Sequence, residues 1–277
     1  MRRPAVKEQF VRRLEQQIAL VTGGASGLGK AIAQRMASEG ATIVISDVQR
    51  ELGYATALKG GFTFLEQDVC DEAQWPEIVK EVEKRFGRLN ILVNNAGVLG
   101  PTQAANPENA SLDGWRKVFA VNVEGVFLGC RAAVPAMRRT GSGAIINLAS
   151  IADRLPNARG VAYGASKAAV RQLTQSVAQY CAQEKLRVRC NSVHPGPVRT
   201  PMLDRFIAEG AQRSGVSIDQ VIAGLKAWIP FGDFILPEDV AAAVAFLASE
   251  DAAQITGSAL YVDGGIIHCS ANGDDNG

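Results

Sequence analysis

The sequence predicts an α/β fold, a Rossmann-like doubly wound sheet of about seven parallel strands with helices on both faces. Short β-branched runs alternate with longer segments of helical character along the chain. Several of these runs are continuously apolar, as strands covered on both faces are. The first run leads through a glycine-rich turn directly into a helical segment, which is typical of a dinucleotide-binding unit.

Seven runs are predicted as strands because each is short, rich in β-branched residues and bounded by turn residues. They begin at residues 18, 42, 62, 90, 144, 186 and 259. The helical stretches between them include residues 27–40, 73–86, 111–138, 163–184 and 237–249, with capping residues such as Asp71, Ser111 and Pro237 at their starts.

The 277-residue chain is predicted to form a single dinucleotide-binding domain over residues 16–277, preceded by an N-terminal extension over residues 1–15. No internal repeat and no Pro- or Ser-rich linker divides it. Residues 200–236 are an apolar insertion without a strand of its own. Two interpretations stay open there, a helical pair that completes the core and a lid over an apolar pocket, and both can hold.

Composition argues against several classes of partner. The chain has 29 basic and 28 acidic residues, so no global field attracts nucleic acid or an anionic membrane, and a small molecule is the expected partner. The N-terminus lacks the apolar region of a secretory signal, and no apolar run approaches the roughly 18 residues of a membrane span. Five cysteines without CxxC spacing and two histidines argue against a disulfide framework and a metal site. A soluble cytoplasmic protein is expected.

The first strand is followed by the sequence TGGASGLG, in which Gly23, Gly27 and Gly29 have the spacing G-x-x-x-G-x-G. Glycines at these positions allow a sharp turn and the close approach of a pyrophosphate to the backbone. The amide groups at the start of the following helix then face the phosphates. Ser26 and Leu28, between the glycines, are expected to contact the same ligand.

The second strand ends on Asp47, 24 residues after Gly23. A carboxylate at about this separation accepts hydrogen bonds from the adenosine ribose hydroxyls and repels a 2′-phosphate. The sequence therefore favours NAD over NADP as the cofactor. Arg50 is the main argument against this preference, unless it is only a solvated residue at a helix start.

Two further turns are expected at the same edge of the sheet, where doubly wound folds bind their ligands. In the first, Asp68, followed by Val69, either accepts a hydrogen bond from the adenine amino group or caps a helix. In the second, Asn94 and the cofactor candidates Asn95, Ala96 and Gly97 follow a buried strand. Two amides and then two small residues are more than a plain turn requires.

Seven motifs occur in order over nearly all of the chain after residue 15. They are TGGASGLG, NNAG, VNVEG with Asn122, IINLAS with Ser150, YGASK, HPGPVRTPM and ITGSALYVDGG. On these motifs the chain resembles the short-chain dehydrogenase/reductase family, in its compact single-domain branch. Residues 71–97 and 143–150 are also similar to bacterial NAD-dependent hydroxysteroid and alicyclic alcohol dehydrogenases.

Tyr163 and Lys167 are four residues apart, which places them on one helix face. Hydride transfer from a secondary alcohol to NAD leaves a hydroxyl proton to be removed, and free tyrosine, with a pKa of about 10, is too weakly ionised for this. An ammonium one helical turn away favours the phenolate. Tyr163 is therefore predicted as the general acid/base and Lys167 as the residue that tunes it.

Ser150 lies 13 residues before Tyr163 at the end of a strand, where its hydroxyl can hydrogen-bond the substrate oxygen. The resemblance further implies that Lys167 binds the nicotinamide ribose and that Asn122 holds a water on the proton path. A Ser-His-Asp hydrolase is not expected, because no G-x-S-x-G elbow is present and His194 is interpreted as structural.

The HPGPVRTPM motif supplies the expected neighbours of the nicotinamide. They are Pro195, Gly196, Val198 and Thr200, whose backbone amides and hydroxyl can fix the carboxamide. The alternative for this motif is a plain Pro/Gly loop.

The resemblance implies a homotetramer in which the helices that carry Asn122 and Tyr163 pair between subunits. Several apolar positions on these helices permit such contacts, but they also suit an ordinary core. They are Val118, Val126, Val170, Leu173 and Val177.

The predicted function is NAD-dependent interconversion of a secondary alcohol and a ketone, on a hydrophobic cyclic substrate such as a hydroxysteroid or an alicyclic or terpenoid alcohol. The apolar segment 202–234, which starts at Met202, together with Leu99, Ile151 and Leu155, suggests such a substrate. Three arginines keep an anionic substrate open, namely Arg154, Arg159 and Arg199. The alternative function is a non-catalytic dinucleotide-binding sensor or scaffold, which the intact Tyr/Lys pair disfavours.

Overall fold

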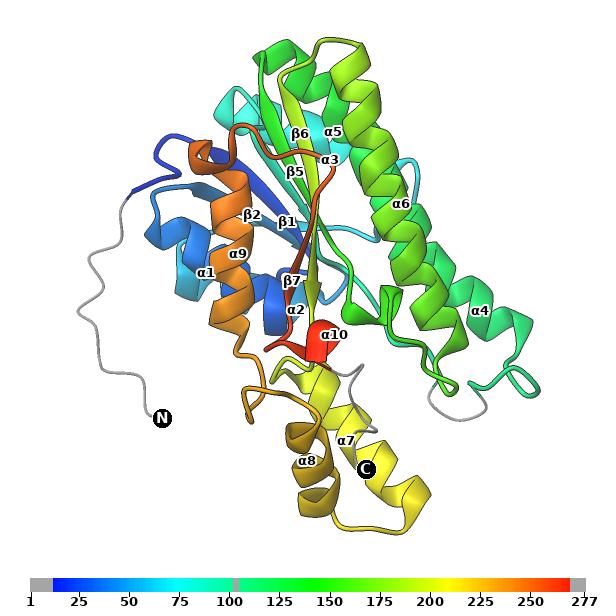
Figure 1. The fold of residues 1–277 in the computed structure, drawn as a ribbon. Helices are drawn as coiled ribbons and strands as arrows, with labels where there is room; N and C mark the ends of the chain where they lie inside the picture. Colours follow the sequence, from blue (N-terminus) through cyan, green and yellow to red (C-terminus); the bar gives the residue numbers. More distant parts are fainter. Residues whose placement is uncertain (1–11, 102–104, 270–277) are drawn as a thin grey trace.

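The computed structural model describes residues 12–101 and 105–269. At its centre lies a seven-stranded, all-parallel sheet in the order β3-β2-β1-β4-β5-β6-β7 (Figure 1). The predicted fold class is confirmed, and each predicted run overlaps one strand. The strands are β1 (Ile18–Thr22), β2 (Thr42–Asp47), β3 (Thr63–Glu66), β4 (Ile91–Asn94), β5 (Gly143–Leu148), β6 (Val188–Pro195) and β7 (Ala259–Val262).

Helices cover both faces of the sheet, and each face has its own apolar cluster. Strand β1 contributes to both, since Ala19 and Val21 point to one cluster and Ile18 and Leu20 to the other. This explains why its sequence is apolar throughout. One face carries α1 (Gly27–Ser38), α2 (Arg50–Gly60) and α9 (Pro237–Ala248), and the other α3 (Gln74–Phe86), α5 (Gly125–Thr140) and α6 (Val161–Gln183).

Helix α2 is not among the stretches singled out from the sequence. It contains Gly53 and Gly60 and leaves Leu52 and Leu58 exposed, so its sequence shows no clear apolar face. Gly53 lets the helix lie directly on β3, because a Cβ there would collide with the ring of Phe64. Tertiary packing therefore decides this helix, which local periodicity does not reveal.

The predicted helix over residues 111–138 is one continuous helical segment with a local defect. It consists of α4 (Leu112–Phe119), a π-helical turn (Ala120–Glu124) and α5. Ser111 caps its start by accepting a hydrogen bond from the Gly114 amide at 3.0 Å. The segment Leu112–Thr140 is long and apolar enough to cross a membrane, but half of its most apolar window is buried in the fold, as in a core helix.

The insertion over residues 200–236 forms two helices, α7 (Pro201–Ser214) and α8 (Ile218–Ala227). They project as a pair beyond the carboxyl ends of the strands (Figure 1). Their apolar side chains, such as Ile207 and Val221, pack against the same cluster as α1 and α9. The helical-pair interpretation is thus confirmed, and the pair stands next to the edge where ligands are expected.

The described end of the N-terminal extension packs against the domain. Leu14 is fully buried in the core, and Arg13 donates two hydrogen bonds of 2.8 Å to the carboxylate of Glu39. Residues 1–11 of the predicted extension lie outside the described residues. Three short helical turns complete the described fold, namely η2 (Ile151–Asp153), η3 (Glu250–Ala252) and α10 (Ile266–Cys269).

Candidate active site

A cavity of about 770 Å³ lies at the carboxyl ends of the strands. The turns that follow β1 to β6 form most of its wall, and α7 and α8 close one side. Strand order reverses between β1 and β4, which is where doubly wound sheets bind ligands. Every residue predicted to contact cofactor or substrate lines it: Gly23, Ser26, Gly27, Leu28, Gly29, Asp47, Asp68, Val69, Asn95, Ala96, Gly97, Leu99, Ser150, Ile151, Leu155, Tyr163, Lys167, Pro195, Gly196, Val198, Thr200 and Met202.

The glycine turn has the backbone that its sequence requires. Gly23 has a φ of +63°, a conformation that side-chain-bearing residues rarely adopt. A Cβ on Gly29 would collide with the carbonyl oxygen of Gly23, so the helix can start close to the turn only with glycine there. Ser26, the N-cap of α1, makes no side-chain capping hydrogen bond. The start of α1 is therefore suited to an anionic group such as a pyrophosphate.

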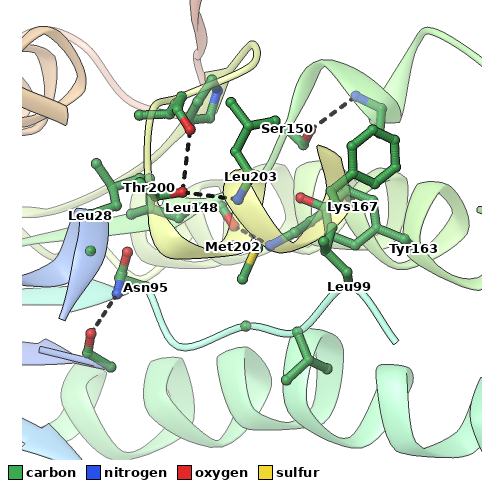
Figure 2. Close-up of a pocket in the computed structure, with 18 of the residues that line it drawn as sticks. Leu28, Asn95, Leu99, Leu148, Ser150, Tyr163, Lys167, Thr200, Met202 and Leu203 are labelled. Atoms are coloured by element: carbon green, nitrogen blue, oxygen red, sulfur yellow. Dashed lines mark hydrogen bonds between the residues drawn. The ribbon is translucent and has the colours of Figure 1, made fainter. Parts of the chain in front are cut away.

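Asn95 joins this turn to the one that follows β4. Its Nδ2 donates to the carbonyl oxygens of Thr22 at 2.9 Å and Gly23 at 3.1 Å. The preceding residue, Asn94, instead faces the interior, and its Nδ2 donates to Oδ1 of Asn147 at 2.8 Å. The two adjacent asparagines thus have different partners, and Asn95 is the one at the cavity wall (Figure 2).

The carboxylate of Asp47 is buried and fixed at the end of β2. Its Oδ2 accepts a hydrogen bond from the Ala25 amide at 3.1 Å, and its Oδ1 accepts one from the Gln49 amide at 3.0 Å. Arg50, the residue that argued for NADP, does not line the cavity and lies 3.5 Å from the carboxylate of Glu66. A negative charge without a cavity-facing arginine beside it is suited to ribose hydroxyls rather than to a 2′-phosphate.

Asp68 does not cap a helix, because the N-cap of α3 is Ala73, and its contact with adenine stays a prediction. Its Oδ1 accepts a hydrogen bond from the Cys70 amide at 2.9 Å, and the residue also lines the cavity. Gln67, directly before it, lines the cavity too and was not singled out from the sequence. Its side chain is 1 % exposed, and both amide atoms lack a hydrogen-bond partner among the described residues. Burying an amide without hydrogen bonds costs free energy unless a ligand supplies them. In the sequence, only the position of Gln67 beside Asp68 could have pointed to it as a site residue.

Ser150, Tyr163 and Lys167 meet at the other end of the cavity. Ser150 follows β5 and hydrogen-bonds Tyr163. Lys167, one turn further along α6, has its Nζ 5.7 Å from the centre of the Tyr163 ring and donates to the Leu148 carbonyl at 2.8 Å. Figure 2 shows these side chains gathered beside Met202 and Leu203, away from Leu28 and Asn95.

The pKa values at this end differ from the predicted direction. Burial raises the pKa of Tyr163, and the hydrogen bond with Ser150 offsets this only in part. Burial also lowers the pKa of Lys167 to about 8. The sequence predicted that Lys167 would lower the pKa of Tyr163, but for the protein's own groups the loss of hydration is the larger effect.

Asn122 is the one predicted site residue that does not line the cavity. It is fully buried in the π-helical turn, where its Oδ1 accepts from the Val98 amide at 2.8 Å and its Nδ2 donates to the Val98 carbonyl at 2.9 Å. A Cβ on Gly97 would lie 3.3 Å from Oδ1 of Asn122 and 3.6 Å from Nζ of Lys167. Asn122 therefore lies just behind the cavity wall, and its role in holding a water stays a prediction.

The wall beyond Ser150 and Tyr163 is apolar. Among the described lining residues, the ionisable side chains are Asp47, Asp68, Tyr163 and Lys167. Arg154, Arg159 and Arg199 are not among them, and Arg199 instead lies 3.3 Å from the carboxylate of Asp204. The basic cluster that an anionic substrate would need is thus absent from the described wall. The apolar side chains there are Leu99, Ile151, Leu155, Met202, Leu203, Phe206, Leu225 and Trp228.

A nicotinamide dinucleotide fits these residues, with an anion-binding helix start, a ribose-binding carboxylate and an orphaned amide in one cavity. Comparisons with known proteins agree. The family model described as "Enoyl-(Acyl carrier protein) reductase" matches residues 23–267. The 3-beta-hydroxysteroid dehydrogenase of Comamonas testosteroni is 37% identical over 93% of this chain and 98% of its own length.

Two further similarities concern the cofactor and the fold. The NADP-dependent (R)-specific alcohol dehydrogenase of Lentilactobacillus kefiri is 36% identical over 91% of this chain and 97% of its own length. The solved structure of Thermoplasma acidophilum aldohexose dehydrogenase, in ligand-free form, superposes with a TM-score of 0.83 at 31% identity. It matches 93% of this chain and 96% of that one.

Proposed function

Because the chain belongs to the short-chain dehydrogenase/reductase family, and the relatives named above are oxidoreductases of alcohol groups, we propose that it interconverts an apolar cyclic secondary alcohol and its ketone with NAD. One observation carries the proposal. A single cavity joins the glycine turn and Asp47 to Ser150, Tyr163 and Lys167. The groups that we propose to bind the cofactor and to transfer the proton thus share one cavity.

The turns after the strands would hold the dinucleotide. The start of α1 would bind the pyrophosphate, and Asp47 would bind the adenosine ribose. Gln67 and Asp68 would contact the adenine. The carboxamide would lie against the turn that contains Pro195, Gly196, Val198 and Thr200. Held there, the dinucleotide would supply the hydride chemistry. The protein supplies the position of the substrate and the path of the proton.

Three side chains act on the substrate oxygen. The Ser150 hydroxyl donates a hydrogen bond to it and stabilises developing negative charge. Tyr163 removes the hydroxyl proton during oxidation and returns it during reduction. Lys167 binds the nicotinamide ribose and, while charged, favours the Tyr163 phenolate that the buried site otherwise disfavours. Oxidation should accordingly speed up as the pH rises toward about 8, where Lys167 begins to lose its charge.

The wall composition supports an uncharged, apolar substrate. Phe206, Trp228 and Leu155 line the same cavity as Tyr163, and no described arginine lines it. Burying apolar surface there stabilises the complex by roughly 25 cal/mol per Å². A relative of similar length is named as acting on a 3-beta-hydroxysteroid, a substrate of this character.

The test is to mix the protein with NAD and a panel of cyclic secondary alcohols and to follow the absorbance of the reduced cofactor. We expect turnover with at least one apolar ring alcohol and slower or no turnover with anionic alcohols. Tight NAD binding without turnover on the whole panel would instead support the sensor or scaffold.

The matched variant is Tyr163→Phe, which removes only the phenolic oxygen. We expect it to lose turnover by at least about 10²-fold while it still binds NAD. Near-normal rates in this variant would contradict the assignment of Tyr163.

A further inference from the structure

A fully buried carboxylate lies directly behind the catalytic serine. Asp153 ends the η2 turn that begins after Ser150, and its side chain is 0 % exposed. A buried charge persists only where it is paired and hydrogen-bonded. Asp153 has partners on three different elements, namely an ion-pair partner on α6, a hydrogen-bond donor on β7 and an imidazole nitrogen on β6. Its Oδ1 and the Nε of Arg171 have no hydrogen-bond partner of ideal geometry among the described residues, and no role in binding cofactor or substrate has been assigned to any of these groups.

The first partner is on α6. Arg171 lies four residues beyond Lys167 and eight beyond Tyr163, so the three share one helix face. Its Nε is 2.9 Å from Oδ2 of Asp153, and its side chain is 34 % exposed. This ion pair ties the helix that carries Tyr163 and Lys167 to the turn that carries Ser150.

The other partners are on β7 and β6. The Tyr261 hydroxyl donates to Oδ2 of Asp153 at 3.0 Å, and burial together with this hydrogen bond raises the pKa of Tyr261 to about 12. His194 on β6 places its Nδ1 3.2 Å from Oδ1 of Asp153. Arg154, the next charged residue along the turn, lies over the Tyr261 ring, with its guanidinium carbon 5.5 Å from the ring centre.

The contacts of His194 determine its tautomer. Nδ1 faces two acceptors, the carboxylate of Asp153 and, at 3.3 Å, the backbone carbonyl of Ser150. Nε2 lies 2.7 Å from the Ser192 hydroxyl, which can donate to it. Nδ1 therefore carries the hydrogen. Burial lowers the pKa of His194, which favours the neutral ring.

We propose that Asp153 is a positioning residue for the reaction. Through the ion pair with Arg171 it fixes α6, and through its contact with the imidazole of His194, whose Nδ1 is hydrogen-bonded to the Ser150 carbonyl, it fixes the backbone of Ser150. The contacts of Asp153 thus fix the distance between the hydroxyl groups of Ser150 and Tyr163, although Asp153 itself lies outside the cavity. A misplacement of about 1 Å between reacting groups costs up to about 10²-fold in rate, which is the effect such a device prevents. The inference rests on the proposed function.

Ser192, His194 and Asp153 together have the contacts of a hydrolase triad, but they cannot act as one. Ser192 is 1 % exposed and His194 0 % exposed, so no substrate reaches the serine. In a triad the carboxylate and the imidazole would activate the serine as a nucleophile. In this protein, Asp153 and His194 instead orient the backbone carbonyl of Ser150.

The experiment compares Asp153→Asn with Asp113→Asn, whose side chain is 96 % exposed. We expect Asp153→Asn, assayed at a temperature at which it remains folded, to lower kcat by about 10- to 100-fold while the NAD dissociation constant changes little. Asp113→Asn should match the wild type. An Asp153→Asn enzyme with wild-type kcat, or one whose NAD affinity falls as far as its kcat, would overturn the proposal.

A second pair of variants tests the hydrogen on Nδ1. The amide nitrogen of His194→Asn lies near the place of Nδ1, whereas that of His194→Gln lies near the place of Nε2. We expect His194→Asn to retain most of kcat and His194→Gln to lose as much as Asp153→Asn. Equal losses in both would show that the Nδ1–H does not fix Ser150.

Nitrogen NMR of the imidazoles gives a readout that needs no turnover, and the chain has only two histidines. We expect His194 to be protonated on Nδ1 and not to titrate between about pH 6 and pH 8, and Asp153→Asn to change that tautomer or that titration. An unchanged His194 signal in Asp153→Asn would refute the coupling. If the wild type turns over no alcohol, the proposed function fails, and the NMR result still decides whether Asp153 orients His194.

Discussion

Burial has opposite consequences for the two catalytic groups on α6. It raises the pKa of Tyr163 and lowers that of Lys167 to about 8, because each loses hydration of its charged form. Near neutral pH Lys167 is still mostly charged and can favour the phenolate. The site therefore keeps a buried ammonium at a cost to stability, which can be measured.

The first prediction concerns that cost. The pKa of Lys167 in the folded chain, about 8, lies below its ordinary value of 10.5, so the unfolded chain binds more protons between these values. The free energy of unfolding should therefore rise with pH in this window, by up to about 1.4 kcal/mol per unit. Urea unfolding of wild type and Lys167→Met at about pH 7, 8 and 9.5 checks this. We expect the free energy of unfolding of the wild type to increase relative to that of the variant as the pH rises. A difference in this free energy that stays constant with pH would contradict the burial of a charge.

The second prediction concerns Asp47 and the choice of cofactor. Asp47→Asn removes the negative charge that repels a 2′-phosphate and weakens the acceptor for ribose hydroxyls. Hydrogen bonds to charged groups contribute about 1.5–3 kcal/mol, so KM for NAD should rise by about 10- to 100-fold and KM for NADP should fall. Arg50→Ala is the control, since Arg50 faces Glu66 and should not change the preference. A wild type that prefers NADP would overturn the cofactor proposal.

At the scale of elements, α7 and α8 form a helical pair that also walls the cavity. Both helices are capped in their own sequence, by Thr200 and Ser217, and both pack side chains into the main core. Their cavity-facing residues include Phe206 and Leu225. The pair is thus placed to select the substrate without taking part in the chemistry.

The third prediction separates substrate binding from cofactor binding on α7. Phe206→Ala removes ring surface from the cavity, and a loss of about 1.5–3 kcal/mol of apolar contact should raise KM for a cyclic alcohol by about 10- to 100-fold. KM for NAD should stay within about twofold. The matched control is Phe231→Ala, because Phe231 is 87 % exposed and does not line the cavity. Equal effects of both variants would show that Phe206 does not contact the substrate.

At the scale of the whole molecule, the resemblance implied a homotetramer through the helices that carry Asn122 and Tyr163. Three of the positions thought to permit it, Val118, Val126 and Val170, are buried in the chain's own core and so give no support. The exposed apolar residues on these helices include Phe127 on α5 and Tyr180 on α6. These two side chains are the better candidates for a subunit contact.

The fourth prediction tests the tetramer and the role of Phe127 and Tyr180 in its contacts. Light scattering should give a mass of four 29.4 kDa chains for the wild type and a smaller mass for the double variant Phe127→Glu, Tyr180→Glu. Charges buried in an interface without partners cost several kcal/mol, which is enough to dissociate it. Leu58→Glu, at a position 86 % exposed on α2, should leave the mass unchanged. A monomeric wild type would disprove the tetramer.

The sequence by itself determined the sheet, the glycine turn and most of the candidate site residues that line the cavity. These features depend on local chemistry, because a buried parallel strand must be apolar and a phosphate turn must have glycines such as Gly23. Spacing along a helix likewise predicted that Tyr163 and Lys167 share a face. Parallel strands then bring the residues after their carboxyl ends together without further information.

Only the tertiary structure decided what depends on contacts between distant segments. Helix α2 packs closely on β3 because Gly53 leaves room for the ring of Phe64, and Gln67 matters because its amide is buried without a hydrogen-bond partner among the described residues. The direction of the Tyr163 pKa shift is set by burial, which the spacing of two residues does not reveal. His194, interpreted from the sequence only as structural, contacts Asp153 and Ser150 across 41 and 44 positions of the chain. Burial and long-range pairing are properties of the folded chain, so they could not be read from its order of residues.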